Sequence, residues 1–275
     1  MHPDEHPKEL LGDKVFELLR NVITQSHPHA QTDVVARALL FFLLRVSNTW
    51  RSMRTLDKNT TDDEGPMVDA GALLRVMFDA YLQAEYIASD EKVAVERAND
   101  YLDFEHVEKY KRAQRVTSYD NPFAQALKAS PHRPTGEVRL QQEYNRVKAR
   151  YLVEKRQPDG TIQRGPRMRR NWYSGTLADI ARSLGKSDEY DILLATFHGC
   201  VHSSAWAVRR GPVISREHIL DWASTIAARI ARLSVEHNRI VLDELHEQIL
   251  AALCRPYCQR ANQNQPVVGE LGSRG

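Results

Sequence analysis

The sequence has 275 residues, of which 42% are apolar and 27% are charged, and its formal net charge at pH 7 is +2. This length and apolar content suffice for a hydrophobic core and exclude a chain that is disordered throughout. The longest unbroken apolar run, residues 38–44, is far shorter than the roughly 20 residues of a membrane-spanning helix. The N-terminal segment lacks the basic-then-apolar pattern of a signal peptide. The sequence therefore predicts a cytoplasmic location and no membrane partner.

The three cysteines are too few and too unevenly placed for a disulfide framework. Cys254 and Cys258 have a spacing that could supply half of a zinc site, but no second Cys or His pair follows nearby. Two free thiols near a helix end are the favoured interpretation, and the sequence assigns no cofactor.

Apolar residues at three- and four-residue spacing predict long helices, and no alternating run bounded by turn residues predicts a strand. Thr32 or Asp33 is the expected N-cap of the second helix. We expect an all-α fold, a multi-helix bundle with a long C-terminal helix. The predicted helices span residues 9–25, 32–59, 66–88, 91–115, 137–155, 176–184, 187–206 and 216–253.

The domain organisation follows from where these helices stop. Residues 1–253 are predicted to form a single helical domain, with a candidate seam at residues 120–136, where prolines interrupt the pattern. A glycine- and arginine-rich loop is expected at residues 157–170. Residues 254–275 are expected to be a disordered tail, because they are polar and carry no helical periodicity.

Positive charge is concentrated in residues 146–170, which contain nine Lys or Arg side chains and two acidic ones. This local excess, with aromatic residues nearby, is typical of segments that contact RNA or another polyanion. A solvated helix face followed by a flexible loop explains the same composition without a ligand. The candidate nucleic-acid-binding residues are Arg164, Arg167, Arg169, Arg170 and Trp172.

A narrow polar stripe interrupts the otherwise apolar third helix. It consists of Arg75, Asp79, Gln83 and Tyr86, which follow one another at three- and four-residue steps. A stripe this narrow favours side chains that line a polar cavity, so Arg75 and Asp79 are candidate catalytic residues. The alternative is an Arg75–Asp79 ion pair that satisfies itself at the edge of the core.

Two histidines lie one helical turn apart near the end of the predicted helix 187–206. His198 and His202 share a face with Asp191, and stacked imidazoles beside a carboxylate are compatible with proton transfer or a metal. This spacing also arises often by chance. Histidines bonded to backbone or water are the favoured alternative.

Arg232 and His237 are five residues apart in the last predicted helix. This spacing is similar to the Arg-x4-6-His signature of the HEPN ribonucleases, which implies catalysis at a ribose hydroxyl. His237 is in register with the apolar residues Ile226, Ile230 and Leu233, so we expect it to point inward or across an interface. A chance pairing in a helix rich in arginine is the alternative.

Two segments, ALLRVMFDAYLQAEYI and NWYSGTLADIARSLGKSDEYDILLATFHGCVHSS, carry a family resemblance. Together they resemble a family of helical, mostly bacterial proteins catalogued only as a domain of unknown function, over roughly residues 31–210. Asp79 stands where that family more often has Glu. The resemblance implies an architecture and a polar site, but no reaction. The positions that match the family pattern are Arg75, Asp79, Trp172, Tyr190 and His202.

These features lead to two functional hypotheses. In the first, Arg75, Asp79 and His202 face one another in a pocket between helices, and the protein is a stress or phage-defence component that acts on or binds RNA or a nucleotide. In the second, the protein is a non-enzymatic interaction module, its polar residues are structural, and its long last helix forms a homodimer.

Overall fold

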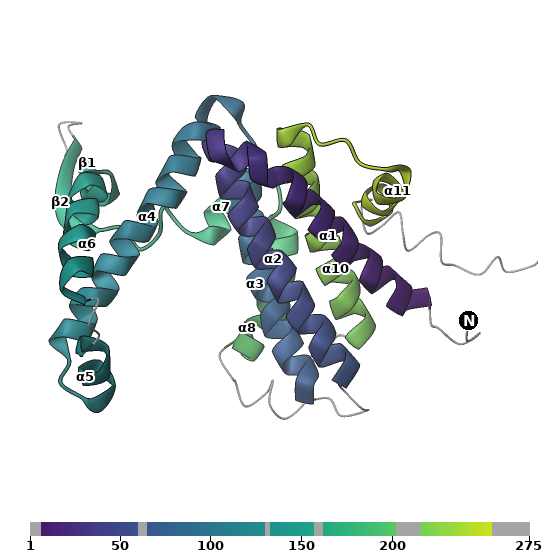
Figure 1. The fold of residues 1–275 in the computed structure, drawn as a ribbon, viewed down its shortest axis with the longest axis horizontal. Helices are drawn as coiled ribbons and strands as arrows, with labels where there is room; N and C mark the ends of the chain where they lie inside the picture. The colour runs from purple at the N-terminus through teal and green to yellow at the C-terminus, as the bar shows by residue number, and fades with distance from the viewer. Residues whose placement is uncertain (1–6, 60–64, 130–132, 157–161, 202–214, 255–275) are drawn as a thin grey trace, which may run out of the picture. The chain divides into compact units, whose positions relative to one another are not determined.

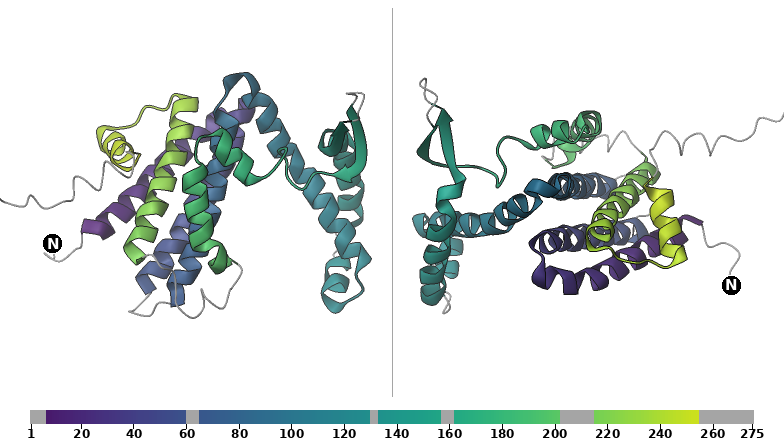
Figure 2. Two further views of the ribbon diagram at one scale, coloured as in Figure 1. Left: turned by 180° about the vertical axis from the view of Figure 1, so that it is seen from behind. Right: turned by 90° about the horizontal axis from the view of Figure 1, so that it is seen from above.

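The computed structural model describes residues 7–59, 65–129, 133–156, 162–201 and 215–254. Nearly all of them are helical, which confirms the prediction of an all-α, multi-helix fold (Figures 1 and 2). No helix within these ranges is long and apolar enough to cross a membrane. The α-helices are α1 Pro7–Thr32, α2 Val34–Asn59, α3 Gly65–Ala88, α4 Glu91–Ser118, α5 Pro122–Lys128, α6 Arg133–Val147, α7 Leu177–Ser183, α8 Ser187–Val201, α10 Arg216–Asn238 and α11 Glu244–Leu253.

The chain divides into two compact units that interleave along the sequence. Unit 1 contains residues 1–27, 40–81 and 193–275, and unit 2 contains residues 28–39 and 82–192. Helices α1, α2, α3 and α8 each contribute residues to both units. The predicted domain limits stay a prediction.

Helix α10 is the centre of unit 1, because helices α1, α2, α3, α8 and α11 all contact it. Asn238 donates to Ser26 Oγ of α1 at 3.2 Å, and the Arg229 guanidinium lies 5.7 Å from the ring centre of Tyr81 in α3. Trp222 meets Phe197 of α8 edge-on, with ring centres 6.2 Å apart. The fourth contact is an ion pair with α2, described below. Small and branched apolar side chains let these helices approach closely. Those buried in α10 are Ile219, Ala223, Ile226, Ala227, Ala228, Ile230 and Ala231.

The first helix is longer than predicted. It was expected to end at residue 25, but α1 continues through Pro28 to Thr32. Asp33 then caps α2, because its Oδ1 accepts from the backbone N–H of Val35 at 2.7 Å and of Ala36 at 3.0 Å. The Asp33 N–H itself still donates to a carbonyl of α1. The expected cap is therefore confirmed, while the expected interruption before it is wrong.

The predicted C-terminal helix 216–253 is two helices. Arg239 adopts a left-handed conformation, with φ 53° and ψ 41°, and its N–H bonds to the carbonyl of Val235. Asp243 begins α11 by accepting from the His246 N–H at 2.9 Å. A helix cannot continue through a left-handed residue, so the chain turns at residues 239–243 and α11 packs against α10.

Unit 2 contains a β-hairpin that the sequence analysis missed. The helix predicted for 137–155 ends with α6 at Val147, and a short 3₁₀ helix, η1 Lys148–Tyr151, leads into β1 Leu152–Arg156. β1 pairs antiparallel with β2 Ile162–Met168, with Glu154 opposite Arg164. Half of the predicted arginine-rich loop, residues 162–168, is therefore strand. Backbone hydrogen bonds between the two strands stabilise this segment.

Two local predictions in unit 2 hold. α7 begins at a reciprocal cap: the Thr176 side chain accepts from the Asp179 N–H, and the Asp179 carboxylate accepts from the Thr176 N–H. It ends where Gly185 takes φ 68°, a conformation that favours glycine. The proline-rich segment expected as a seam contains α5, which Asn121 caps and Pro122 begins.

Candidate functional site

Arg75 and Asp79 of the polar stripe form an ion pair, with Arg75 Nε 2.8 Å from Asp79 Oδ1. Both belong to unit 1, one turn apart on α3. Arg75 is only 8% exposed, whereas Asp79 is half-buried. A guanidinium this deeply buried requires a counter-charge, because an unpaired charge in the protein interior is strongly destabilising. The two candidate catalytic residues are thus held together.

Burial raises the pKa of Asp79, although the charge of Arg75 and its hydrogen bond lower it. The net pKa lies above that of an ordinary aspartate. The loss of hydration therefore raises the pKa of this carboxylate by more than the interaction with Arg75 lowers it. A carboxyl group with a raised pKa can exchange a proton closer to neutral pH than an exposed one.

The other two residues of the stripe, Gln83 and Tyr86, lie in unit 2 and surround Trp172. Trp172 Nε1 donates to Gln83 Oε1 at 2.8 Å, and the Tyr86 ring centre is 5.9 Å from that of Trp172. The Arg97 guanidinium covers Tyr86, 3.8 Å from its ring centre. Both side chains therefore contact the indole of Trp172, and the expectation that they line a polar cavity stays a prediction.

His198 lies in α8, where only its backbone is described, and His202 lies outside the described residues. Asp191 is exposed and Tyr190 is half-buried. Within the described ranges, no group of three or more His, Cys, Asp or Glu side chains is placed to hold a metal ion. The pocket formed with His202 stays a prediction.

Arg232 and His237 do not form an inward-facing pair. Arg232 Nε binds Glu236 Oε1 at 2.6 Å, and both side chains are more than half exposed. Hydrogen bonding to Glu236 raises the pKa of Arg232. His237 is exposed, so it does not point into the core of this chain, and an orientation across an interface stays a prediction. The side chains buried at this end of α10 are instead those of Ser234 and Asn238.

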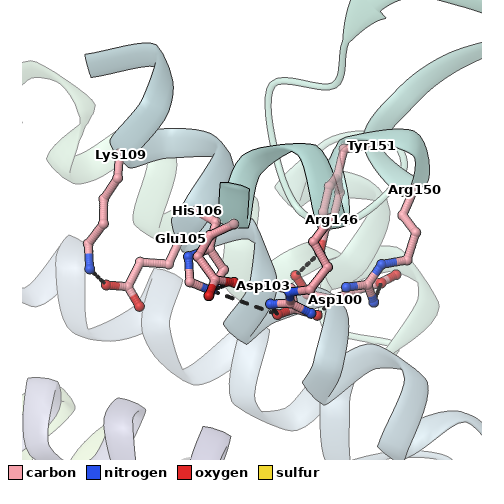
Figure 3. Close-up of polar contacts among 9 residues, drawn as sticks. Asp100, Asp103, Glu105, His106, Lys109, Arg146, Arg150 and Tyr151 are labelled. Atoms are coloured by element: carbon pink, nitrogen blue, oxygen red, sulfur yellow. Dashed lines mark hydrogen bonds and ion pairs between the residues drawn. The ribbon is translucent and has the colours of Figure 1, made fainter. Parts of the chain in front are cut away.

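Two arginines of the basic segment, Arg146 and Arg150, are neutralised by α4 (Figure 3). Arg146 Nη2 lies 2.9 Å from Asp103 Oδ1, and Arg150 Nη1 lies 3.2 Å from Asp100 Oδ1. Arg150 also bonds to Asp103 Oδ2. These pairs join α4 to α6 and η1 within unit 2. They therefore explain part of the positive charge structurally.

Burial raises the pKa of Asp103, but hydrogen bonds from Arg146 and Arg150 outweigh it and leave the pKa below the ordinary value. At Asp100, by contrast, burial dominates the attraction of Arg150 and the pKa is raised. His106 and Glu143 complete this ion-pair cluster, with His106 Nε2 3.8 Å from Glu143 Oε2. The sequence analysis missed the cluster, since 43 and 47 residues separate Asp103 from its two arginines. The i,i+3 spacing of Asp100 and Asp103 was its only local signal.

The remaining candidates for nucleic-acid contact surround the end of β2. Arg167 and Arg170 are exposed, and Arg169 is half-buried, with its carbonyl accepting from Lys111 Nζ of α4 at 3.0 Å. The Arg164 side chain lies outside what the structure describes. Trp172 is 5% exposed, so it anchors the segment and cannot offer an open stacking face. Tyr173 is half-buried and meets Trp172 edge-on.

The sequence matches the model of a family described as a family of unknown function, DUF5677, over residues 36–216. This match covers more than half of the chain, so the chain belongs to that family. The matched residues include the Arg75–Asp79 pair, the ion-pair cluster, the hairpin and Trp172. No curated protein and no solved structure matches the sequence.

Proposed function

We propose that this member of the DUF5677 family binds RNA, or a chemically similar polyanion, through the basic end of its hairpin in unit 2. The observation that carries the proposal is the contrast within one segment. Arg146 and Arg150 are neutralised by Asp100 and Asp103. Arg167 and Arg170 are exposed, and no carboxylate partner is found for them in the described part of the chain.

Exposed guanidinium groups without carboxylate partners attract phosphate, and phosphate binding releases counterions from the polyanion. The backbone that carries these arginines is held in place by contacts of neighbouring residues. Lys111 of α4 holds the carbonyl of Arg169, and the buried Trp172 fixes the chain two residues after Arg170. Arg167 precedes these anchors in β2. Two cations are thus presented on a fixed backbone, which lowers the entropic cost of binding.

The test is the affinity of the full chain for a fluorescein-labelled single-stranded RNA, measured by anisotropy between 50 and 200 mM salt. The double variant R167Q/R170Q should weaken binding about tenfold and make the logarithmic salt slope shallower by about 1.4, if each arginine contacts one phosphate. R45Q/R51Q is the matched control, because Arg45 and Arg51 are exposed arginines of α2. Salt-independent binding, or equal losses in both variants, would contradict the proposal.

A second proposal concerns chemistry at the Arg75–Asp79 pair, with His202 as the third group. It is supported by the burial of Arg75 and the raised pKa of Asp79. In this proposal the pair and the imidazole act on RNA or a nucleotide, in a setting of stress or phage defence. Asp79→Asn and His202→Ala should then abolish cleavage of labelled RNA or phosphate release from nucleoside triphosphates, while urea denaturation shows a folded protein. Retained turnover in both variants would contradict it.

The alternative is a non-enzymatic interaction module. It is supported by the polar contacts themselves, since Gln83, Asp100 and Asp103 all have structural partners. In that case the chain should show no turnover of RNA or nucleotides. It should also sediment as a dimer at micromolar concentration, and Asp79→Asn should change stability alone.

A further inference from the structure

Arg54 of α2 is a buried cation whose hydrogen bonds are only partly made. Its side chain is 13% exposed, and its Nη1 lies 2.9 Å from Asp57 Oδ2. The other two guanidinium nitrogens, Nε and Nη2, are fully buried, and neither has a hydrogen-bond acceptor among the residues that the structure describes. Nε and Nη2 lie along one edge of the guanidinium, and this edge can bind two oxygens of one oxyanion at once.

A second buried donor lies one helical turn before Arg54. Trp50 is 1% exposed, and its ring centre is 6.0 Å from the Arg54 Cζ. Its indole Nε1 is buried and likewise has no acceptor within the described ranges. A buried donor without an acceptor destabilises the fold, more strongly when the donor is charged. Three such nitrogen atoms on neighbouring side chains indicate a shared acceptor rather than three separate defects.

Among the described residues, the ion-pair group that contains Arg54 has a net positive charge. Arg216 of α10 also binds Asp57, with Arg216 Nε 2.5 Å from Asp57 Oδ1 and Nη2 2.5 Å from the Asp57 carbonyl. One carboxylate therefore serves two guanidinium groups, and Asp57 itself is only 11% exposed. The pairing leaves an excess of one positive charge at this place in unit 1. A bound anion would neutralise it.

Gly12 of α1 packs directly against the guanidinium group of Arg54. A Cβ at Gly12 would lie 2.5 Å from Arg54 Cζ and 2.6 Å from both Nε and Nη2. Because glycine has no Cβ, α1 can lie this close to the guanidinium and cover it. Any larger residue at position 12 would displace the guanidinium.

We propose that Arg54 and Trp50 form a binding site for a small oxyanion of the phosphate class, covered by α1 at Gly12. Arg54 Nε and Nη2 donate to two oxygens of the anion, and Trp50 Nε1 donates to a third. A third donor favours a tetrahedral oxyanion over a carboxylate, which offers two oxygens. Asp57 and Arg216 hold the Arg54 side chain in place and are positioning residues. This site lies in unit 1 and is independent of the hairpin arginines.

The test is isothermal titration of the full chain with inorganic phosphate, with sodium acetate and sodium chloride at the same ionic strength as separate arms. Phosphate should bind with a 1:1 stoichiometry and chloride should give no signal. Acetate should bind at least about tenfold more weakly than phosphate, because one donor loses its partner. Equal responses to all three salts would overturn the proposal. Equal affinity for acetate would overturn the assignment to phosphate.

Trp50→Phe is the main variant, because it keeps the buried ring and removes only the indole donor. It should weaken phosphate binding about tenfold. Gly12→Ala should abolish binding by displacing Arg54, and Arg51→Met, an exposed arginine on the same helix, should leave affinity unchanged. R167Q/R170Q should also leave phosphate affinity unchanged, which separates this site from RNA contact. Unaltered binding in Trp50→Phe and Gly12→Ala would overturn the site.

Discussion

The indole N–H of Trp172 donates to the side-chain oxygen of Gln83 at 2.8 Å, across 89 residues of sequence. Tyr86 and Tyr101 flank the same ring, with ring centres 5.9 and 5.6 Å from that of Trp172. The bond therefore ties the segment after the hairpin to the end of α3 and the start of α4. Gln83 and Tyr86, the two stripe residues of α3 that lie in unit 2, therefore have a structural role there.

Replacing Gln83 by Leu should lower the free energy of unfolding by about 1–3 kcal/mol, because the buried indole N–H then has no acceptor. Urea denaturation followed by tryptophan fluorescence measures this. Trp172→Phe combined with Gln83→Leu should cost less than the sum of the two single changes. Strict additivity would show that the hydrogen bond contributes nothing.

Asp103→Asn should destabilise the protein by about 1 kcal/mol at neutral pH, a value reduced by solvent screening because Arg146 is exposed. The pKa of Asp103 is lowered in the folded state, so its contribution is present above the unfolded pKa of about 3.9 and is lost as pH falls through the folded pKa. Unfolding free energies of wild type and variant should therefore converge as the pH falls through the folded pKa of Asp103. A constant difference across pH 2–7 would contradict this prediction.

Asp79→Asn should have the opposite pH dependence. The pKa of Asp79 is raised on folding, so the stabilisation associated with its protonated form is present below the unfolded pKa and is lost as pH rises through the folded pKa. Wild type should lose stability relative to the variant as pH rises above about 4. Urea titrations at several pH values measure this, with Asp221→Asn, an exposed residue of α10, as the control. A pH-independent difference would mean that burial does not dominate at Asp79.

Arg232→Ala and His237→Ala should each change the free energy of unfolding by less than about 0.5 kcal/mol, since both side chains are exposed. Thermal melts of the two variants test this. If the pair were a ribonuclease centre, the same variants would lose RNA cleavage without losing stability. A loss of stability above 1 kcal/mol in His237→Ala, on the order expected for a buried polar contact, would contradict its exposed placement.

Most helices could be predicted because their causes are local. Periodic apolar residues place α2, α3, α4 and α8, and side-chain caps at Asp33 and Thr176 mark where α2 and α7 begin. The Arg75–Asp79 ion pair, which was the alternative interpretation of the stripe on α3, is present. These features could be predicted without knowing which distant segments of the chain contact them.

The features that the sequence did not reveal depend on distant contacts or on unusual backbone. The turn after α10 uses a left-handed arginine, Arg239, where a glycine would have signalled the stop. The hairpin lacks alternating apolar residues, although Asp159-Gly160 between its strands is a turn signal that we did not use. The pairing of Arg150 with Asp100 could not be inferred locally, because it requires α4 to lie beside η1.

The left-handed residue between α10 and α11 also decides where the apolar side chains of the last described segment go. As a straight continuation, residues 239–253 would project roughly 22 Å beyond α10. Folded back, they keep Leu242, Ile249 and Leu253 away from water, and His246 reaches Asn21 of α1 at 3.3 Å. The left-handed conformation of one residue thus lets α11 bury its apolar side chains against unit 1, where a straight helix would expose them to solvent.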